Sequence, residues 1–128
     1  MSDAKYSVVI PVHNSSKIIP LTVSKVCDFF KSSGYKFEII LVNDGSPDNS
    51  EKVYTELAKI YPNINFISLR KNFGEFNAVM CGLNHAEGKY TVIIDDDFQN
   101  PPSEIIKLVE KAQVENLDVV YSFYAEKK

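Results

Sequence analysis

The chain has 128 residues, which suits one domain, because domains usually span about 100 to 200 residues. Its composition, 45% hydrophobic and 24% charged, is that of a globular protein and excludes repetitive or disordered chains. The formal net charge is −3 and basic residues form no cluster larger than a pair, so the chain lacks the positive field of a nucleic-acid-binding protein. We therefore predict one domain whose partners do not include DNA or RNA.

The first expected element is an apolar strand at residues 6–12, too short for a signal peptide core or for a membrane span of about 20 residues. The two cysteines, Cys27 and Cys81, fall within apolar helical patterns and have no second Cys or His at metal-ligand spacing. We expect both thiols to be buried and reduced, and the chain to be cytoplasmic with no segment crossing a membrane.

Strands and helices are expected to alternate along the whole chain. Apolar runs rich in Val, Ile, Tyr and Phe predict strands at residues 6–12, 37–42, 64–69, 90–94 and 117–124. Apolar residues at helical spacing predict the intervening helices over residues 19–30, 53–60, 79–86 and 105–112. The strands begin about 30 residues apart, the size of a βαβ unit. We therefore predict an α/β fold, an open and mostly parallel sheet with helices on both faces.

Two glycines follow predicted helices. Gly34 and Gly88 stand where a left-handed residue commonly ends a helix, and we expect that conformation at both.

The segments directly after the predicted strands are the most informative about function. In an open α/β sheet, ligands bind beyond the carboxyl ends of the strands. The segments at those ends are residues 11–14, 43–46, 70–74 and 95–100. They are therefore the candidates for a functional site.

Three adjacent carboxylates, Asp95, Asp96 and Asp97, end the fourth predicted strand. Their mutual repulsion calls for a cation, and side chains alternate along an extended chain, so Asp95 and Asp97 share one side. Mg²⁺ or Mn²⁺ suits such a pair and takes its remaining ligands from water and phosphate oxygens. The alternative is a solvated acidic turn in which Asp97 or Asn100 caps the following helix.

The other strand ends are ambiguous by themselves. Asp44 and Gly45 could form an ordinary turn, or the Asp44 carboxylate could accept the ring N–H of a uracil or guanine. Pro11 and Asn14 are common boundary residues, and a lone His13 favours a structural role.

Taken together, these segments resemble family 2 glycosyltransferases, which have the GT-A fold. The resemblance rests on four motifs that occur in order, and it covers residues 6 to about 124. It is closest to the polyprenyl-phosphate sugar transferases, the branch that contains dolichol-phosphate mannosyltransferase. The motifs are Val9-Ile10-Pro11-Val12-His13-Asn14, Val42-Asn43-Asp44-Gly45-Ser46-Pro47-Asp48, Asn72-Phe73-Gly74 with Ala78 and Gly82, and Asp95-Asp96-Asp97-Phe98-Gln99-Asn100-Pro101-Pro102.

The resemblance implies an inverting, metal-dependent transfer of sugar from a UDP- or GDP-sugar to a polyprenyl phosphate or a glycan. It implies that Asp95 and Asp97 are catalytic and hold Mg²⁺ or Mn²⁺ on the donor diphosphate. The nucleotide sugar would be bound by Pro11, Val12, Asn14, Asp44, Asp96 and Gln99, with Asp44 at the base.

The chain departs from the family pattern in two places. Asn43 stands where the family has a first Asp, and Ser122-Phe123-Tyr124 stands where it has Gly-Ser-Arg. Family members also continue beyond this length. We therefore expect residues 1–128 to be the donor-binding part, inactive without the acceptor half, with membrane association only in the full-length protein. An apolar face around Val119, Tyr121 and Phe123 is expected to favour a homo-oligomer.

Two other functions fit a chain of this size. A receiver module for signalling has five parallel strands and an acidic metal pocket, but its acids follow the first and third strands, which here end at residues 11–14 and 70–72. A Rossmann dehydrogenase needs G-x-G-x-x-G after its first strand, and this sequence has none there.

Overall fold

The computed structural model describes residues 6–45, 50–69, 71, 73–96, 102–115 and 119–121. Within these ranges strands and helices alternate, as predicted. The strands are β1 (Tyr6–Val12), β2 (Phe37–Asn43), β3 (Ile64–Ser68), β4 (Tyr90–Ile93) and β5 (Val119–Tyr121), and the helices are α1 (Ile19–Ser33), α2 (Ser50–Ile60), α3 (Glu75–His85) and α4 (Pro102–Val114). The sequence prediction is thus confirmed in element type and order. The ends of β2, β3 and β4 differ from it by one residue.

All strand pairs are parallel, and their order in the sheet is β3-β2-β1-β4-β5. A receiver module has the order 2-1-3-4-5, so this topology excludes that alternative. The observed order equals the first five positions of the Rossmann order 3-2-1-4-5-6. Strand order therefore does not separate the chain from a dehydrogenase, and the missing glycine motif remains the argument against one.

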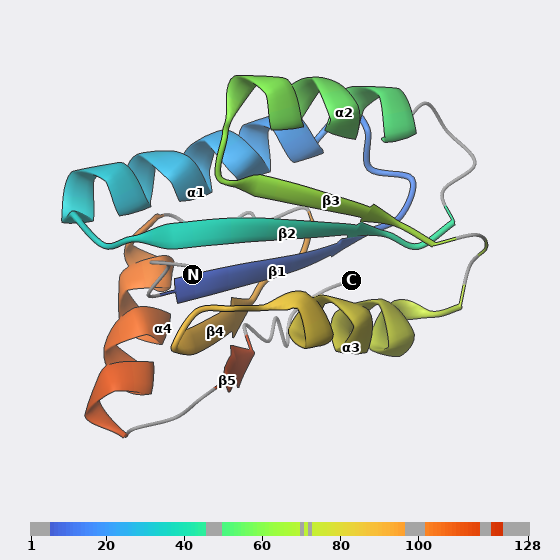
Figure 1. Ribbon diagram of the computed structural model, residues 1–128. Helices are drawn as coiled ribbons and strands as arrows, with labels where there is room; N and C mark the ends of the chain where they lie inside the picture. The colour runs from blue at the N-terminus through green and yellow to red at the C-terminus, as the bar shows by residue number, and fades with distance from the viewer. Residues whose placement is uncertain are drawn as a thin grey trace.

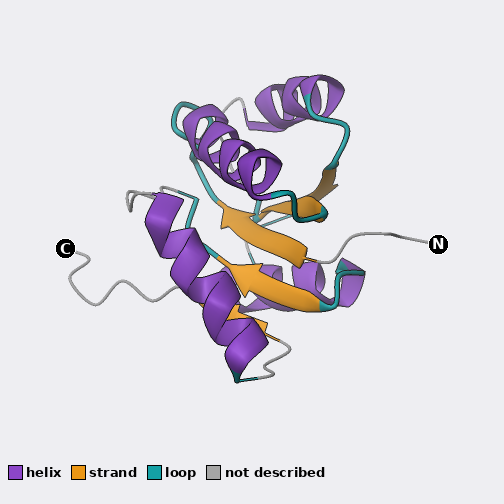
Figure 2. Ribbon diagram, turned by 90° about the vertical axis from the view of Figure 1, so that its left-hand side faces the viewer, coloured by secondary structure: helices purple, strands orange, loops and turns teal. Residues whose placement is uncertain are grey.

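Helices cover both faces of the sheet (Figure 1). α1 and α2 lie together on one face, α3 lies alone on the opposite face, and α4 packs against α1 and β5 (Figure 2). Every residue of β1 and β2 is buried, because these neighbouring strands are covered from both sides. Two groups of buried side chains result. The larger fills the space beneath α1, α2 and α4, and the smaller joins Ala78 and Val79 of α3 to Val9, Ile40, Val42 and Ile93.

Aromatic side chains close the amino edge of the sheet. The Tyr6 ring lies 5.9 Å from the Phe30 ring, 5.1 Å from Tyr35 and 5.4 Å from Tyr90, measured between centroids. Burial raises the pKa of the Tyr6 phenol to about 12, so it stays neutral at physiological pH. Around Tyr6 the amino edge of the sheet is therefore closed by aromatic packing.

The glycines that follow α1 and α3 serve different purposes. Gly34 has φ +82° and its N–H donates to the Phe30 carbonyl at 3.1 Å, which confirms the predicted left-handed end of α1. The same prediction for Gly88 is wrong, because α3 ends through Ala86 in extended conformation and Gly88 does not have positive φ. A Cβ on Gly88 would lie 2.7 Å from the Ser7 nitrogen. This glycine lets the loop before β4 approach the β1 backbone.

Replacing Gly88 with alanine is expected to lower the free energy of unfolding by about 2 kcal/mol, within the usual range for overpacking. Two of the three nearest atoms, the Ser7 nitrogen and the Tyr6 carbonyl carbon, belong to the β1 backbone, so they cannot yield by a rotamer change. Urea unfolding followed by circular dichroism measures the loss. Asn84→Ala, an exposed change on α3, should stay within about 0.5 kcal/mol of the wild type. Equal stability of Gly88→Ala and Asn84→Ala would contradict the close approach.

Three further expectations concern burial. Cys27 is buried, and burial raises the pKa of its thiol to about 11, as predicted for a core residue. Cys81 is only half-buried, so the prediction of two buried thiols is wrong for it. Val119 is 44% exposed, which agrees with the expected apolar surface at β5. The Tyr121 side chain and Phe123, the other members of that surface, lie outside what the structure describes. No helix in the described ranges is long and apolar enough to cross a bilayer.

Candidate functional site

The sheet divides at its carboxyl edge, between β1 and β4. β1 pairs with β2 as far as Val12, but its last pair with β4 is Val9 with Ile93. The Ile94 N–H donates to the Val9 carbonyl, and successive residues alternate sides, so the nitrogen of Pro11 faces the side from which β4 has departed. Because proline has no N–H, no backbone donor is left without an acceptor at this position. The opening lies where the connections turn from one side of β1 to the other, the position at which α/β sheets bind ligands.

A small cavity of about 60 Å³ lies at this division. Its described lining residues are Pro11, Val12, His13, Asp44, Glu75, Asp95 and Asp96. Five of the eight residues proposed from sequence thus meet at one place. Asn14 is not among the lining residues, and Asp97 and Gln99 lie outside the described part of the chain. The cavity has room for a few water molecules or an ion, so a nucleotide would have to lie across the strand ends.

The charge around this cavity is of one sign. Four carboxylates line it, from β2, α3 and the end of β4, and no Lys or Arg is among the described lining residues. Carboxylate oxygens are the ligands that Mg²⁺ and Mn²⁺ prefer. The donor set therefore fits a hard divalent cation, although no three potential ligands among the described residues already stand at metal-binding distances.

Asp44 is held by the start of α3. It is 4% exposed, and its two carboxylate oxygens accept the Phe73 N–H at 2.8 Å and the Gly74 N–H at 3.1 Å. Gly74 stands at the N-cap with φ +99°, a conformation that suits glycine, and it has no side chain with which to cap the helix. Asp44 supplies that cap from β2 and places a negative charge at the positive end of the helix. The backbone of Phe73 and Gly74 thus holds Asp44 beside the cavity.

Asp96 joins the end of β4 to the loop between β1 and α1. Its carboxylate accepts from the Ser15 hydroxyl and from the His13 N–H at 3.3 Å. Its backbone carbonyl accepts from the Thr22 hydroxyl at 2.7 Å. These contacts brace the loop that forms one wall of the cavity.

His13 and Asn14 fix the path of the same loop. The Nδ1 atom of His13 lies 3.0 Å from the Asp44 carbonyl oxygen. A carbonyl can only accept, so Nδ1 carries the proton in this contact and Nε2 is an acceptor in the neutral ring. Asn14 has φ +57°, which Asn tolerates better than most residues. The turn therefore explains an Asn at this position, and its proposed contact with a nucleoside stays a prediction.

Sequence reasoning missed Ser15, Thr22 and Glu75. Thr22 could have been found from the sequence, because it lies three residues after Ile19 on the apolar stripe of the predicted helix. In the structure it is buried on that side of α1. A hydroxyl on a buried stripe needs an acceptor, and Asp96 provides it. No pattern in the sequence pointed to Ser15 or Glu75.

Asn43, where the family has Asp, turns toward β3, and its side-chain nitrogen lies 3.5 Å from the Ser68 hydroxyl.

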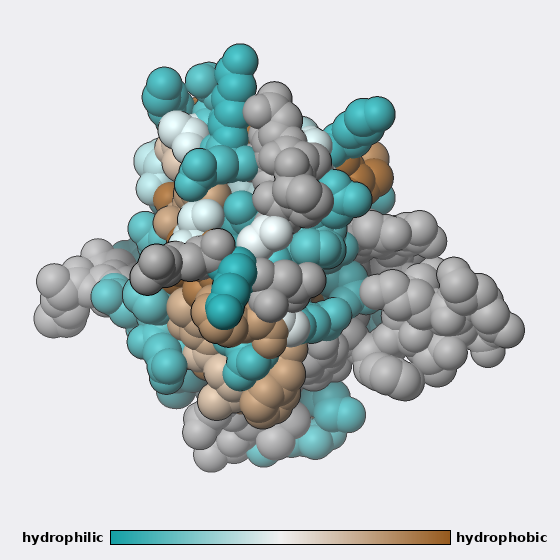
Figure 3. Space-filling model, turned by 90° about the vertical axis from the view of Figure 1, so that its right-hand side faces the viewer, coloured by the Kyte–Doolittle hydropathy of each residue, from teal (hydrophilic) through white to brown (hydrophobic). Residues whose placement is uncertain are grey.

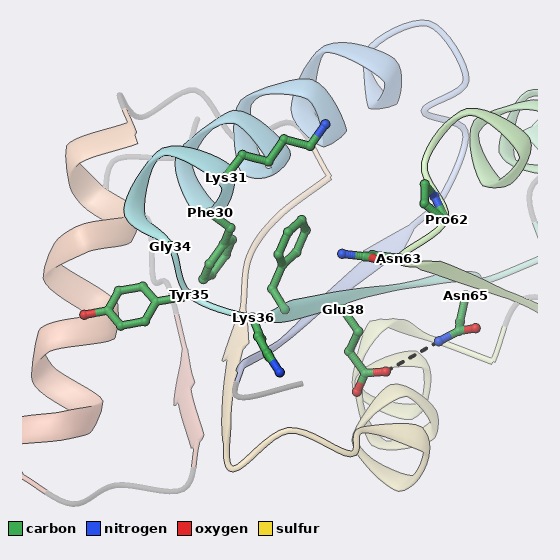
Figure 4. Close-up of a pocket in the computed structure, with 10 residues that line it drawn as sticks. Phe30, Lys31, Gly34, Tyr35, Lys36, Glu38, Pro62, Asn63 and Asn65 are labelled. Carbon is green, nitrogen blue, oxygen red and sulfur yellow. Dashed lines mark hydrogen bonds between the residues drawn. The ribbon is translucent and has the colours of Figure 1, made fainter. Parts of the chain in front are cut away.

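A larger cavity, of about 570 Å³, opens at the amino edge of the sheet (Figure 4). Its charged side chains do not converge. The Lys31 amine, the Tyr35 hydroxyl and the Lys36 amine point in different directions, and Glu38 is engaged with Asn65 (Figure 4). Without a convergent polar group this cavity lacks the features of a binding site, so the small acidic cavity is the better candidate.

Known proteins are similar to this chain over most of its length. The profile of the family described as "Glycosyl transferase family 2" matches residues 7–128. The chain is 43% identical over 117 residues to the undecaprenyl-phosphate 4-deoxy-4-formamido-L-arabinose transferase of Proteus mirabilis, a match that covers 91% of this chain and 36% of that protein. The chain thus spans about a third of the length of this relative.

Solved structures share the fold. A mannosyltransferase from Pyrobaculum calidifontis, in complex with GDP-Man and Mn²⁺, matches with a TM-score of 0.74 and 19% identity, covering 88% of this chain and 33% of that one. The S. aureus TarS fragment 1–349 in complex with UDP-GlcNAc matches with a TM-score of 0.69 and 24% identity, covering 88% of this chain and 32% of that one. The expected GT-A fold is confirmed. Since the family profile covers nearly all of the sequence, the chain belongs to glycosyl transferase family 2.

Proposed function

We propose that this chain binds the nucleotide-diphosphate sugar of a metal-dependent, inverting glycosyltransferase. The observation that carries the proposal is the meeting of Pro11, Asp44 and Asp95, from three separate motifs, at one acidic cavity on the carboxyl edge. The Pyrobaculum structure, which holds GDP-Man and Mn²⁺, supports both the kind of donor and a divalent metal. The donor here is a UDP- or a GDP-sugar.

In this proposal the base of the nucleotide lies against Asp44. Each oxygen of that carboxylate accepts a hydrogen bond from one backbone N–H. An ionised carboxylate offers about four acceptor positions, so not all of them are used. A further position can accept the ring N–H of the base. Pro11, Val12 and Asn14 would line the nucleoside, and Asp96 and Gln99 would support the diphosphate side.

Asp95 and Asp97 would hold Mg²⁺ or Mn²⁺ at the end of β4. Asp95 lines the acidic cavity, and its partner Asp97 lies two residues further along the chain. When bound, the cation would neutralise the diphosphate and favour its departure. Asp96, braced by Ser15 and Thr22, keeps Asp95 at the cavity by fixing the backbone that follows it.

The acceptor in the proposed reaction is a polyprenyl phosphate. The Proteus relative, an undecaprenyl-phosphate transferase, supports this choice. An acceptor phosphate oxygen forms the bond to the anomeric carbon while the bond from that carbon to the donor diphosphate breaks, with inversion. A phosphomonoester is largely ionised at neutral pH, its second pKa being about 6, so no strong base is needed to activate it. The whole enzyme would act on the cytoplasmic face of a membrane, with residues 1–128 as its donor-binding part.

Calorimetry of the 128-residue chain with UDP and GDP tests the donor site. We expect binding of one of them in Mn²⁺ and at least about tenfold weaker binding in EDTA, because the acidic cavity repels a bare diphosphate. Asp95→Asn should give a similar loss in Mn²⁺.

Asp28→Asn is the matched control, since Asp28 is an exposed carboxylate on α1, and it should bind as the wild type does. Equal affinity in Mn²⁺ and EDTA would refute the metal assignment. Absence of binding by both nucleotides would refute the donor site.

A further inference from the structure

The start of α3 carries an exposed apolar surface beside the acidic cavity. Phe73, Phe76 and Met80 are 47%, 74% and 42% exposed, although large apolar side chains are usually buried. The buried residues of α3, Ala78, Val79 and Gly82, lie on its other side. Figure 3 looks onto the carboxyl ends of the strands and shows a hydrophobic area in its lower half, at the height of α3.

This surface adjoins the candidate site at the start of α3. The Phe73 N–H donates to Asp44, and the next helical residues after Gly74 are Glu75, which lines the cavity, and Phe76. Phe76 and Met80 are one turn apart, so their side chains are neighbours along the helix. An apolar path therefore begins at the rim of the cavity and runs along α3.

The charge at the rim complements an anion. Lys71 is exposed, and its Nζ lies 5.6 Å from the centre of the Phe73 ring. The cavity itself is lined by carboxylates, which repel a phosphate. Lys71 thus offers a positive charge at the place where the apolar path meets this negative cavity. An apolar path with a cation at its end fits an amphiphile that has a long hydrocarbon chain and an anionic head.

We propose that Lys71, Phe73, Phe76 and Met80 form the surface along which the prenyl chain of the lipid-phosphate acceptor reaches the site. The proposal rests on the proposed function for the identity of the acceptor. The prenyl chain packs against Phe73, Phe76 and Met80, and Lys71 attracts the phosphate head toward the cavity. The surface therefore helps to select a prenyl phosphate over a water-soluble phosphate.

Flotation with vesicles tests this surface without any nucleotide. The 128-residue chain is mixed with phosphatidylcholine vesicles that contain undecaprenyl phosphate, the same amount of phosphatidylglycerol, or undecaprenol. We expect binding to be strongest with undecaprenyl phosphate. The double variant Phe76→Ser/Met80→Ser should weaken it by about tenfold or more, since burying one large apolar side chain is worth roughly that factor. Lys71→Gln should reduce the preference for the phosphate over undecaprenol.

The matched control is Leu21→Ser/Ile60→Ser, which removes two exposed apolar side chains from α1 and α2, on the opposite face of the sheet. It should bind as the wild type does. Circular dichroism should show all variants folded, because the substituted side chains are exposed.

Several results would overturn the proposal. Equal binding to the phosphatidylglycerol vesicles would assign the surface to anionic bilayers in general. Unchanged binding by Phe76→Ser/Met80→Ser would remove the surface from the acceptor path. A dimer of the wild type that this variant dissociates, seen by sedimentation velocity, would assign it to contacts between copies. Nucleotide binding is measured separately, so failure of the donor site and failure of this surface are distinguishable.

Discussion

Asp44→Ala is expected to lower the free energy of unfolding by about 3 kcal/mol and to weaken nucleotide binding at least about tenfold. The stability loss follows from the two N–H groups of Phe73 and Gly74, which lose a nearly buried, charged acceptor. Hydrogen bonds to charged groups contribute about 1.5 to 3 kcal/mol each, and neighbouring bonds do not add fully. The binding loss follows from removal of the group proposed to hold the base.

Urea unfolding and calorimetry separate the two effects of Asp44. Asp44→Asn keeps one oxygen acceptor but turns an N–H₂ group toward a backbone donor, so its stability should lie between those of the wild type and Asp44→Ala. Asp28→Ala is the control for loss of an exposed carboxylate. Wild-type stability of Asp44→Ala would contradict its capping of α3. Wild-type nucleotide binding by folded Asp44→Ala would contradict its role at the base.

Glu38→Ala is expected to cost about 3 kcal/mol of stability without changing nucleotide binding. Glu38 is 8% exposed, and its Oε2 accepts from the Ser7 hydroxyl at 2.6 Å and from the Glu87 N–H at 2.7 Å. The Ser7 Oγ in turn accepts from the Gly88 N–H at 2.8 Å. This cluster joins β1, β2 and the loop before β4 toward the amino edge, away from the donor site. Loss of the Glu38 carboxylate leaves the Ser7 hydroxyl and the Glu87 N–H without their acceptor in a buried place.

A double-mutant cycle with Ser7→Ala tests whether the cluster acts as a unit. The double variant Glu38→Ala/Ser7→Ala should lose less stability than the sum of the single variants, because the first change already removes the shared hydrogen bond. Glu56→Ala, at an exposed ion pair with Lys59, should stay within about 0.5 kcal/mol of the wild type. Additive losses at Glu38 and Ser7 would show that the two side chains do not cooperate, and a fall in nucleotide affinity would contradict the separation of cluster and site.

The sequence determined the local structure and the chemistry of the site. The unbroken apolar runs of β1 and β2 predict strands covered on both faces, and both strands are fully buried. Gly34 predicts a left-handed end for α1 and has it. The acids after β4 predict a negative site at the carboxyl edge, where Asp95 and Asp96 line the cavity. Each of these predictions depends on residues close in sequence, and hydrophobic periodicity together with side-chain chemistry is enough to make them.

The tertiary structure decided which distant residues meet. The strand order β3-β2-β1-β4-β5 places β4 beside β1, and only this placement brings Asp96 to Ser15 and Gly88 against Ser7. The sequence around Asp44 is typical of a turn, but in the structure Asp44 caps α3, a helix that begins 31 residues later. Glu38 reads as one polar residue in a strand, yet its partners come from the strand and the loop packed beside it. Local patterns set which face of an element is apolar, whereas partners across the sheet depend on the order in which the elements pack.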